Sequence, residues 1–130
     1  MIAFDSSALT KLVVRERETA PLRAWLAARE EATWSAGSLT RVEVVRAVAR
    51  AQAAAVPAAR RLLAGVDLVP LGPDVLEVAA DPGPPSLRSL DALHLATALS
   101  LGSALDAFVV YDEPLAQAAT DAGLPVVAPA

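Results

Sequence analysis

Short apolar runs alternate with longer amphipathic segments along the whole chain. Apolar runs that end at Gly, Pro or a polar residue are typical of buried strands, whereas apolar residues that recur every three or four positions indicate helices. The runs predict strands at residues 2–4, 33–36, 66–71, 107–111 and 126–128. The periodic segments predict helices at residues 6–14, 20–31, 39–54, 57–65, 73–80, 88–101 and 113–122, with a loop at 81–86.

The order of these elements predicts the fold class. Helices separate all consecutive strands, and strands joined through helices usually pair in parallel in a sheet that is covered on both faces. The chain of 130 residues has the length of one domain. We therefore expect a single α/β domain at residues 1–130, a three-layer α/β/α sandwich with a mostly parallel central sheet.

Four acidic residues fall where such a fold brings side chains together. Asp5 and Asp112 directly follow two of the apolar runs, and Glu43 and Asp91 lie in two of the expected helices. The carboxyl edge of an open parallel sheet is where ligands bind. Carboxylates crowded there repel one another and raise each other's pKa unless a divalent cation neutralises them. The pattern therefore predicts a site for a hard, oxygen-binding cation, Mg²⁺ or Mn²⁺.

Three of these carboxylates also have a purely structural interpretation. Asp5 and Asp112 each stand just before an expected helix, where a carboxylate accepts a hydrogen bond from a free backbone N–H as an N-cap. Asp91 lies near the start of the helix at 88–101, where the macrodipole favours a negative charge. Each residue alone leaves both interpretations open, and the joint pattern favours the cation site.

Glu43 fits the pattern least well. On a helical wheel it lies outside the apolar arc of its helix and beside Arg46 and Arg50, so an exposed ion pair is the alternative interpretation. The expected apolar arc consists of Val42, Val44, Val45, Val48 and Ala49.

Two further side chains near these acids carry chemistry. His94 lies three residues after Asp91 in the sequence and is a candidate general base. A single His in an apolar helix, with Leu90 and Leu99 expected to face inward, is more typical of a hydrogen-bonded structural residue. Ser7 could donate to a metal-binding carboxylate or to a metal-bound water, or it could cap the first helix.

Basic residues are concentrated in the first half of the chain. Ten of the eleven Lys and Arg residues lie in residues 1–61, which carry a net charge of +4, whereas residues 62–130 carry −8. Arginines beside an acidic metal site could contact the phosphates of a nucleic acid, although solvated helix faces are the simpler interpretation of composition alone. The arginines considered for phosphate contacts are Arg15, Arg17, Arg41, Arg46 and Arg50.

Composition excludes several other classes of protein. With no Cys and one His, disulfides and Cys/His zinc sites are excluded. The first apolar run ends after residue 4 with no basic segment before it, so we expect no signal peptide. No stretch of 18 residues is apolar enough for a membrane span. These features together favour a cytoplasmic protein that does not associate with membranes.

The segments around the four acids resemble the PIN-domain family, and in particular the VapC-like toxins of bacterial type II toxin–antitoxin modules. The resemblance spans essentially the whole chain. The matching segments are IAFDSSAL at 2–9, SLTRVEV at 38–44, RSLDALHLATA at 88–98 and VVYDEPLAQAA at 109–119.

The resemblance implies both an activity and a set of site residues. The acidic quartet of the family falls on Asp5, Glu43, Asp91 and Asp112, and its small hydroxyl position falls on Ser7. The implied protein is a Mg²⁺-dependent endoribonuclease that cuts an RNA needed for translation. Asp5 and Asp91 would be the principal metal ligands, and Glu43 and Asp112 would complete the site directly or through water. A separately encoded antitoxin protein and a homodimer are also expected.

Two other functional classes remain as alternatives. The first is a phosphoryl-handling α/β enzyme, either a haloacid-dehalogenase-like hydrolase or a response-regulator receiver. A haloacid-dehalogenase-like hydrolase normally has a second Asp two residues after its nucleophile, where this chain has Ser7. A response-regulator receiver has a Lys after a late strand, whereas the only Lys here is Lys11. The remaining alternative is a PIN-fold module that binds RNA or protein without cutting, and the complete acidic quartet argues against it.

Overall fold

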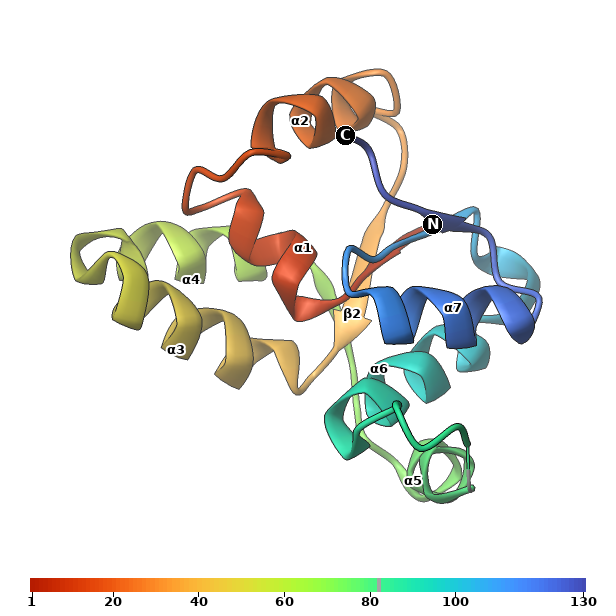
Figure 1. Ribbon diagram of the computed structural model, residues 1–130. Coiled ribbons are helices and arrows are strands. Elements are labelled where there is room, and N and C mark those ends of the chain that lie inside the picture. The colour runs from red at the N-terminus through yellow and green to blue at the C-terminus, as the bar shows by residue number, and fades with distance from the viewer. Residues whose placement is uncertain (82) are drawn as a thin grey trace.

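Five short strands form one parallel sheet at the centre of the protein (Figure 1). The computed structural model describes residues 1–81 and 83–130, and Pro82, in the loop expected at 81–86, lies outside the described residues. The strands are β1 (Ile2–Phe4), β2 (Trp34–Gly37), β3 (Asp67–Val69), β4 (Ala107–Val109) and β5 (Val126–Val127), in the order β3-β2-β1-β4-β5. All neighbouring strands are parallel. The carboxyl ends of the strands therefore meet at one edge of the sheet.

The helices follow the predicted order. They are α1 (Ser6–Lys11), α2 (Thr19–Ala27), α3 (Thr40–Ala51), α4 (Val56–Ala64), α5 (Pro73–Ala80), α6 (Ser89–Ser100) and α7 (Glu113–Asp121), with single 3₁₀ turns at η1 (Ala53–Ala55) and η2 (Gly102–Ala104). Within the described part of the chain, no helix combines the length and apolar character needed to cross a membrane.

Two predicted helices end earlier than their apolar pattern. The first helix stops at Lys11 and not at Val14, because Thr19 Oγ1 donates to the carbonyl of Lys11 (2.7 Å) and satisfies it outside the helix. The second stops at Ala27, where Arg29 folds back and donates to the carbonyl of Trp25 (2.8 Å). In both places a side chain replaces the next helical hydrogen bond.

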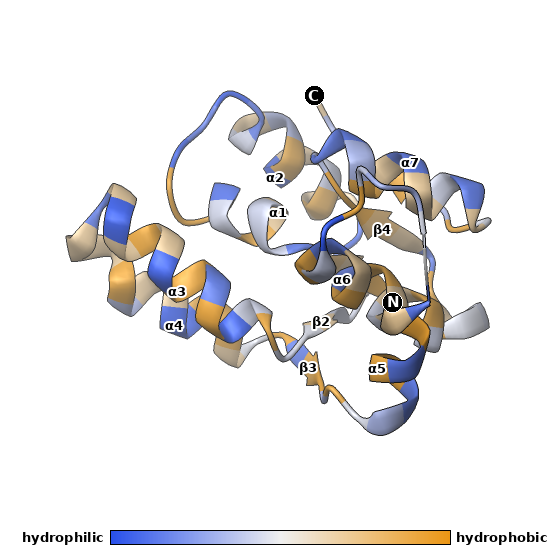
Figure 2. Ribbon diagram, turned by 60° about the horizontal axis from the view of Figure 1, so that its bottom comes forward, coloured by the Kyte–Doolittle hydropathy of each residue, from blue (hydrophilic) through white to orange (hydrophobic). Residues whose placement is uncertain are grey.

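The helices cover both faces of the sheet, which confirms the three-layer α/β/α sandwich. Ile2 and Phe4 face one side, where they pack with α1, α2, α3 and α4. Ala3 and Phe108 face the other side, where they pack with α6 and α7. In Figure 2, α3, α4 and α7 each carry both hydrophobic and hydrophilic residues, as expected for helices with one face on the sheet.

The apolar face expected for α3 is wrong at one edge, where Val42 and Ala49 are exposed. Val44 and Val48 are fully buried and the partly buried Val45 packs against the same core, but Val42 is 55% exposed. The core covers the rest of the expected arc, so Val42 faces outward beside Glu43.

Two positions expected to face inward on α6 are wrong as well, since Leu90 is 48% and Leu99 is 36% exposed. Small residues face the sheet instead, and Thr97 approaches β2 closely. A Cβ at Gly37 would lie 3.1 Å from Thr97 Oγ1, which is too close for ordinary packing. Glycine at position 37 therefore lets α6 approach the sheet, and this approach fixes where its first turn points.

Candidate active site

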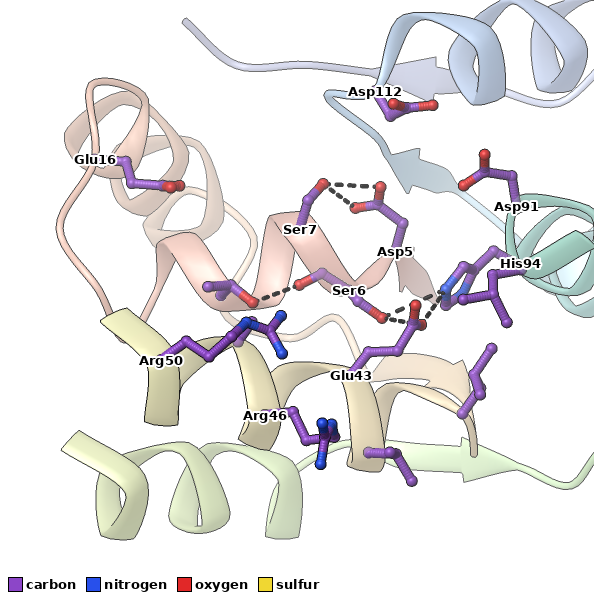
Figure 3. Close-up of a pocket in the computed structure, with 15 residues that line it drawn as sticks. Asp5, Ser6, Ser7, Glu16, Glu43, Arg46, Arg50, Asp91, His94 and Asp112 are labelled. Atoms are coloured by element: carbon purple, nitrogen blue, oxygen red, sulfur yellow. Dashed lines mark hydrogen bonds and ion pairs between the residues drawn. The ribbon is translucent and has the colours of Figure 1, made fainter. Parts of the chain in front are cut away.

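The four acidic residues singled out by the sequence line a single cleft of about 600 Å³ (Figure 3). Each stands at the start of a different helix: Asp5 and Asp112 are the N-caps of α1 and α7, and Glu43 and Asp91 lie in the first turns of α3 and α6. The positive end of a helix dipole favours a carboxylate, which offsets part of the repulsion among the four. The fold therefore brings together acids that are more than a hundred residues apart.

Asp5 is the most buried of the four, with 4% of its surface exposed. Its Oδ1 accepts a hydrogen bond from the Ala8 N–H (2.9 Å), and Ser7 Oγ donates to both carboxylate oxygens (3.0 and 2.9 Å). Burial raises the pKa of Asp5 to about 6, although the bonds from Ala8 and Ser7 lower it, and the charge of Asp112 raises it further. Asp5 thus caps a helix and lines the cleft, so its two interpretations are compatible.

Asp91 and Asp112 face the same space as Asp5 in Figure 3. Asp112 Oδ2 accepts a hydrogen bond from the Leu115 N–H (3.1 Å), as predicted for an N-cap. Burial raises the pKa of Asp91, and the negative charge of Asp112 raises it further, while the Arg88 guanidinium acts in the opposite direction. The charge of Asp112 therefore acts on both Asp91 and Asp5, as expected where carboxylates line one cleft.

Glu43 does not form the ion pair with Arg46 that the helical wheel suggested. Its Oε1 accepts hydrogen bonds from Ser6 Oγ (2.6 Å) and from His94 Nε2 (2.6 Å). Burial acts to raise the pKa of Glu43, but the bonds from His94 and Ser6 outweigh it and hold the pKa below its ordinary value. The half-buried side chain reaches into the cleft because its partners lie on α6 and α1 and not on its own helix.

His94 is hydrogen-bonded, as the sequence favoured, and its partner is the candidate site residue Glu43. It is 5% exposed. A carboxylate can only accept, so Nε2 carries the proton that is donated to Glu43. Ser6 Oγ lies 3.4 Å from the same nitrogen, and Nδ1 has no hydrogen-bond partner among residues 1–81 and 83–130. Ser6 itself was missed, since its only signal was its place beside Asp5.

The site residues fit a hard cation in the chemistry of their donor atoms, but not yet in their present orientations. The donors are carboxylate oxygens, which suit Mg²⁺ and Mn²⁺. Burial, and to a smaller extent the charge of Asp112, raises the pKa of Asp5 and Asp91, and a bound cation would act in the opposite direction. In the described part of the chain, no three His, Cys, Asp or Glu side chains converge closely enough to hold an ion together. Cation binding would therefore require carboxylates to rotate away from their present orientations.

The opposite end of the cleft is basic. Of the five arginines considered for phosphate contacts, Arg46 and Arg50 line the cleft, and both are exposed. Lys11 bonds to Glu16 (3.0 Å) and Glu18 (3.1 Å) and does not line the cleft. A catalytic Lys of the receiver type is thus missing from the described lining of the cleft. The exposed Val42 and Leu90 contribute an apolar lip to the same cleft.

Comparison with protein families gives a match over almost the whole chain. A family model described as the PIN domain matches residues 2–120.

Among curated proteins, Ribonuclease VapC47 of Mycobacterium tuberculosis (strain CDC 1551 / Oshkosh) is 45% identical over 134 residues, which cover 99% of this chain and 97% of that protein. Ribonuclease VapC46 of M. tuberculosis (strain ATCC 25618 / H37Rv) is 44% identical over 128 residues, which cover 98% of this chain and 97% of that protein.

Among solved structures, the crystal structure of M. tuberculosis VapC20, described as a toxin that cleaves the sarcin–ricin loop, superposes with a TM-score of 0.74. The match covers 99% of this chain and all of that chain at 19% sequence identity. At this identity the likeness shows the shared fold.

Proposed function

This chain belongs to the PIN-domain family, and we propose that it is a metal-dependent endoribonuclease, the toxin component of a type II toxin–antitoxin module. One observation supports the activity above all others. Four carboxylates from the starts of four helices line one cleft at the carboxyl edge of the sheet. The curated relatives that match almost the full length of the chain are named ribonucleases, which supports RNA as the substrate.

In this proposal Mg²⁺ or Mn²⁺ is held chiefly by Asp5 and Asp91, with Glu43 and Asp112 completing the site directly or through water. The raised pKa values of Asp5 and Asp91 support the choice, because these carboxylates gain most from a cation. When bound, the metal supplies an activated water at neutral pH and offsets the charge that develops on the phosphate oxygens.

The neighbouring polar side chains orient the proposed ligands. Ser7 donates to both oxygens of Asp5 and restricts the rotation of that carboxylate. Ser6 and His94 donate to the same oxygen of Glu43, which leaves Oε2 available to face the cleft. These bonds come from α1 and α6, so the packing of three helices sets the position of Glu43.

The proposed partners follow from the same comparison. An antitoxin protein is expected because the relatives are named VapC. A homodimer is expected because Leu76, Val78 and Leu99 leave large apolar side chains exposed on α5 and α6. Light scattering at micromolar concentration tests the second expectation, and a monomer would contradict it.

Cleavage of RNA by the purified protein tests the proposed function. The protein should cut RNA in the presence of Mg²⁺ or Mn²⁺, stop when EDTA is added, and resume when excess metal is restored. Cleavage that persists in EDTA would contradict metal dependence. A folded protein that binds RNA and cuts none with either ion would instead be a binding module.

A further inference from the structure

The cleft has two uncompensated positive charges at the end away from Asp91 and Asp112. Arg46 and Arg50 line it, and within residues 1–81 and 83–130 neither forms an ion pair. Glu16 also lines this end, but its carboxylate is engaged by Lys11 at 3.0 Å. The basic end is therefore available to a negatively charged ligand.

Both arginines lie on the same stripe of α3 as Glu43. Positions 43, 46 and 50 are three and then four residues apart, which places them on one face of a helix. Arg46 and Arg50 are separated by about 6 Å along the helix axis, from a rise of about 1.5 Å per residue. Figure 3 shows them following Glu43 along α3, away from Asp91 and Asp112.

We infer that Arg46 and Arg50 form a phosphate-binding subsite that holds the RNA backbone beside the bond to be cut. This inference rests on the proposed function. A strand whose scissile phosphate lies at the carboxylates must continue along a wall of the cleft, and α3 provides the wall with positive charge. The planar guanidinium group pairs with phosphate oxygens through two parallel hydrogen bonds. Two arginines one turn apart suit two successive phosphates.

The subsite reads the backbone and not the sequence of the RNA. Contacts to phosphates position a nucleic acid without distinguishing its bases, and they weaken as the salt concentration rises, because the release of counterions from the nucleic acid then becomes less favourable. Arg15, Arg17 and Arg41 do not line the cleft and are outside the subsite. Of the arginines considered from the sequence, Arg46 and Arg50 are the two that line the cleft together with the acidic residues.

The test compares two double variants with the same change in net charge. Arg46→Ala with Arg50→Ala removes the subsite, and Arg60→Ala with Arg61→Ala removes two exposed arginines of α4 that do not line the cleft. Binding of a fluorescein-labelled single-stranded RNA is followed by anisotropy in EDTA, so that cleavage does not interfere. Kd is measured over a range of salt concentrations, and KM and kcat are measured separately with Mg²⁺.

The subsite predicts a rise in Kd of about tenfold for the first variant and a change below about twofold for the second. The slope of log Kd against log salt should fall by about 1.4 in the first variant, at about 0.7 for each phosphate. KM should rise in parallel while kcat stays close to that of the parent. Thermal unfolding checks the fold, and Arg46→Gln with Arg50→Gln replaces the Ala variant if that one unfolds.

The inference is overturned if both double variants lose equal affinity, if the Arg46 and Arg50 variant binds RNA like the parent, or if the parent binds no RNA at low salt. Loss of binding to an acidic peptide with unchanged RNA binding would overturn it too, and would assign the arginines to a protein partner. A parent that binds RNA through this pair but never cuts it would contradict the proposed function and leave the subsite standing.

Discussion

The two ends of the cleft differ in how firmly their charged side chains are held. At the acidic end, Asp5 is buried and Glu43 half-buried, and hydrogen bonds from other side chains fix both of them. At the basic end, Arg46 and Arg50 are exposed and no ion pair restrains them in the described structure. Carboxylates held by neighbouring side chains suit the chemical step, which requires close placement, and the rotation that accompanies cation binding would complete that placement. Exposed arginines suit the attraction of a flexible polyanion, which does not require such exact placement.

The two ends of the cleft also differ in how much their charged side chains cost the stability of the fold. Crowded, desolvated carboxylates raise the pKa of Asp5 and Asp91, whereas exposed arginines impose little cost on folding. Substitutions of Asp5 and Asp91 by Asn should therefore remove activity without harming stability. Substitutions at the basic end should change mainly the strength of RNA binding.

The largest effect is expected for Asp91→Asn, which should lower kcat/KM for RNA cleavage by roughly a hundredfold or more, the scale of losing one electrostatic contact to a transition state. The variant should be at least as stable as the parent, because it removes a charge from a repulsive cluster. Asp74→Asn is the matched control, since Asp74 is also in the first turn of a helix but outside the cleft. Equal activity losses in the two variants, measured by gel-based cleavage, would contradict the site.

A smaller effect is expected in the dependence of stability on pH. Because folding raises the pKa of Asp5 from 3.8 to about 6, the folded state binds more protons than the unfolded state between these values. This carboxylate therefore lowers the free energy of unfolding as pH rises from about 4 to 6, by about 3 kcal/mol in total.

Asp5→Asn should remove this component while keeping the helix cap, since Asn also caps helices well. Urea unfolding in EDTA at about pH 4 and about pH 7 measures the difference between parent and variant. Added Mg²⁺ at about pH 7 should stabilise the parent more than the variant. A parent and a variant with parallel pH profiles would show that Asp5 ionises normally.

A smaller effect than that of Asp91→Asn is expected from substitution of His94, a positioning residue that acts through Glu43. His94→Leu removes the donor and should weaken both kcat/KM and Mn²⁺ affinity by about tenfold or more, as for other side chains that orient metal ligands. His94→Gln keeps an N–H donor and should recover part of both. Calorimetry with Mn²⁺ provides the reading independent of activity, and identical Mn²⁺ affinity in the two variants would assign His94 to packing alone.

The smallest effect is expected from single arginine substitutions. Arg46→Ala should raise KM by up to about fivefold, the equivalent of an exposed ion pair worth about 0.2–1 kcal/mol. Arg41→Ala, on the same helix but outside the cleft, should leave KM unchanged within error. Steady-state cleavage at low salt measures both. A larger effect at Arg41 would place the RNA path over the start of α3 and not along its later turns.

Sequence patterns predicted the order of strands and helices, because the signals for them are local. They predicted helix caps less well. The sequence places Ser38, a good cap former, just before α3, but the N-cap position is Leu39, which makes no side-chain cap hydrogen bond. The helix begins at Thr40, whose Oγ1 donates to the carbonyl of Gly37 (2.7 Å). Which residue stands at the cap position depends on where the strand before it stops.

Predictions of which side chains face the core failed at Val42 and Leu90. Both are apolar and fall on plausible helical stripes, yet both are exposed at the cleft. A helical pattern defines an apolar arc but not how much of it the neighbouring layer covers. Here the close approach of Thr97 to Gly37 decides the rotation of α6, and no local pattern contains that contact.

The sequence by itself determined the fold class and the four acidic residues, because strand and helix periodicity and the placement of Asp after apolar runs are properties of neighbouring residues. The tertiary structure alone decided the partners: that Glu43 bonds to Ser6 and His94 and not to Arg46, and that Arg46 and Arg50 share a cleft with acids from three other helices. Contacts between distant segments depend on how helices pack across the sheet, and packing is set by the whole chain at once.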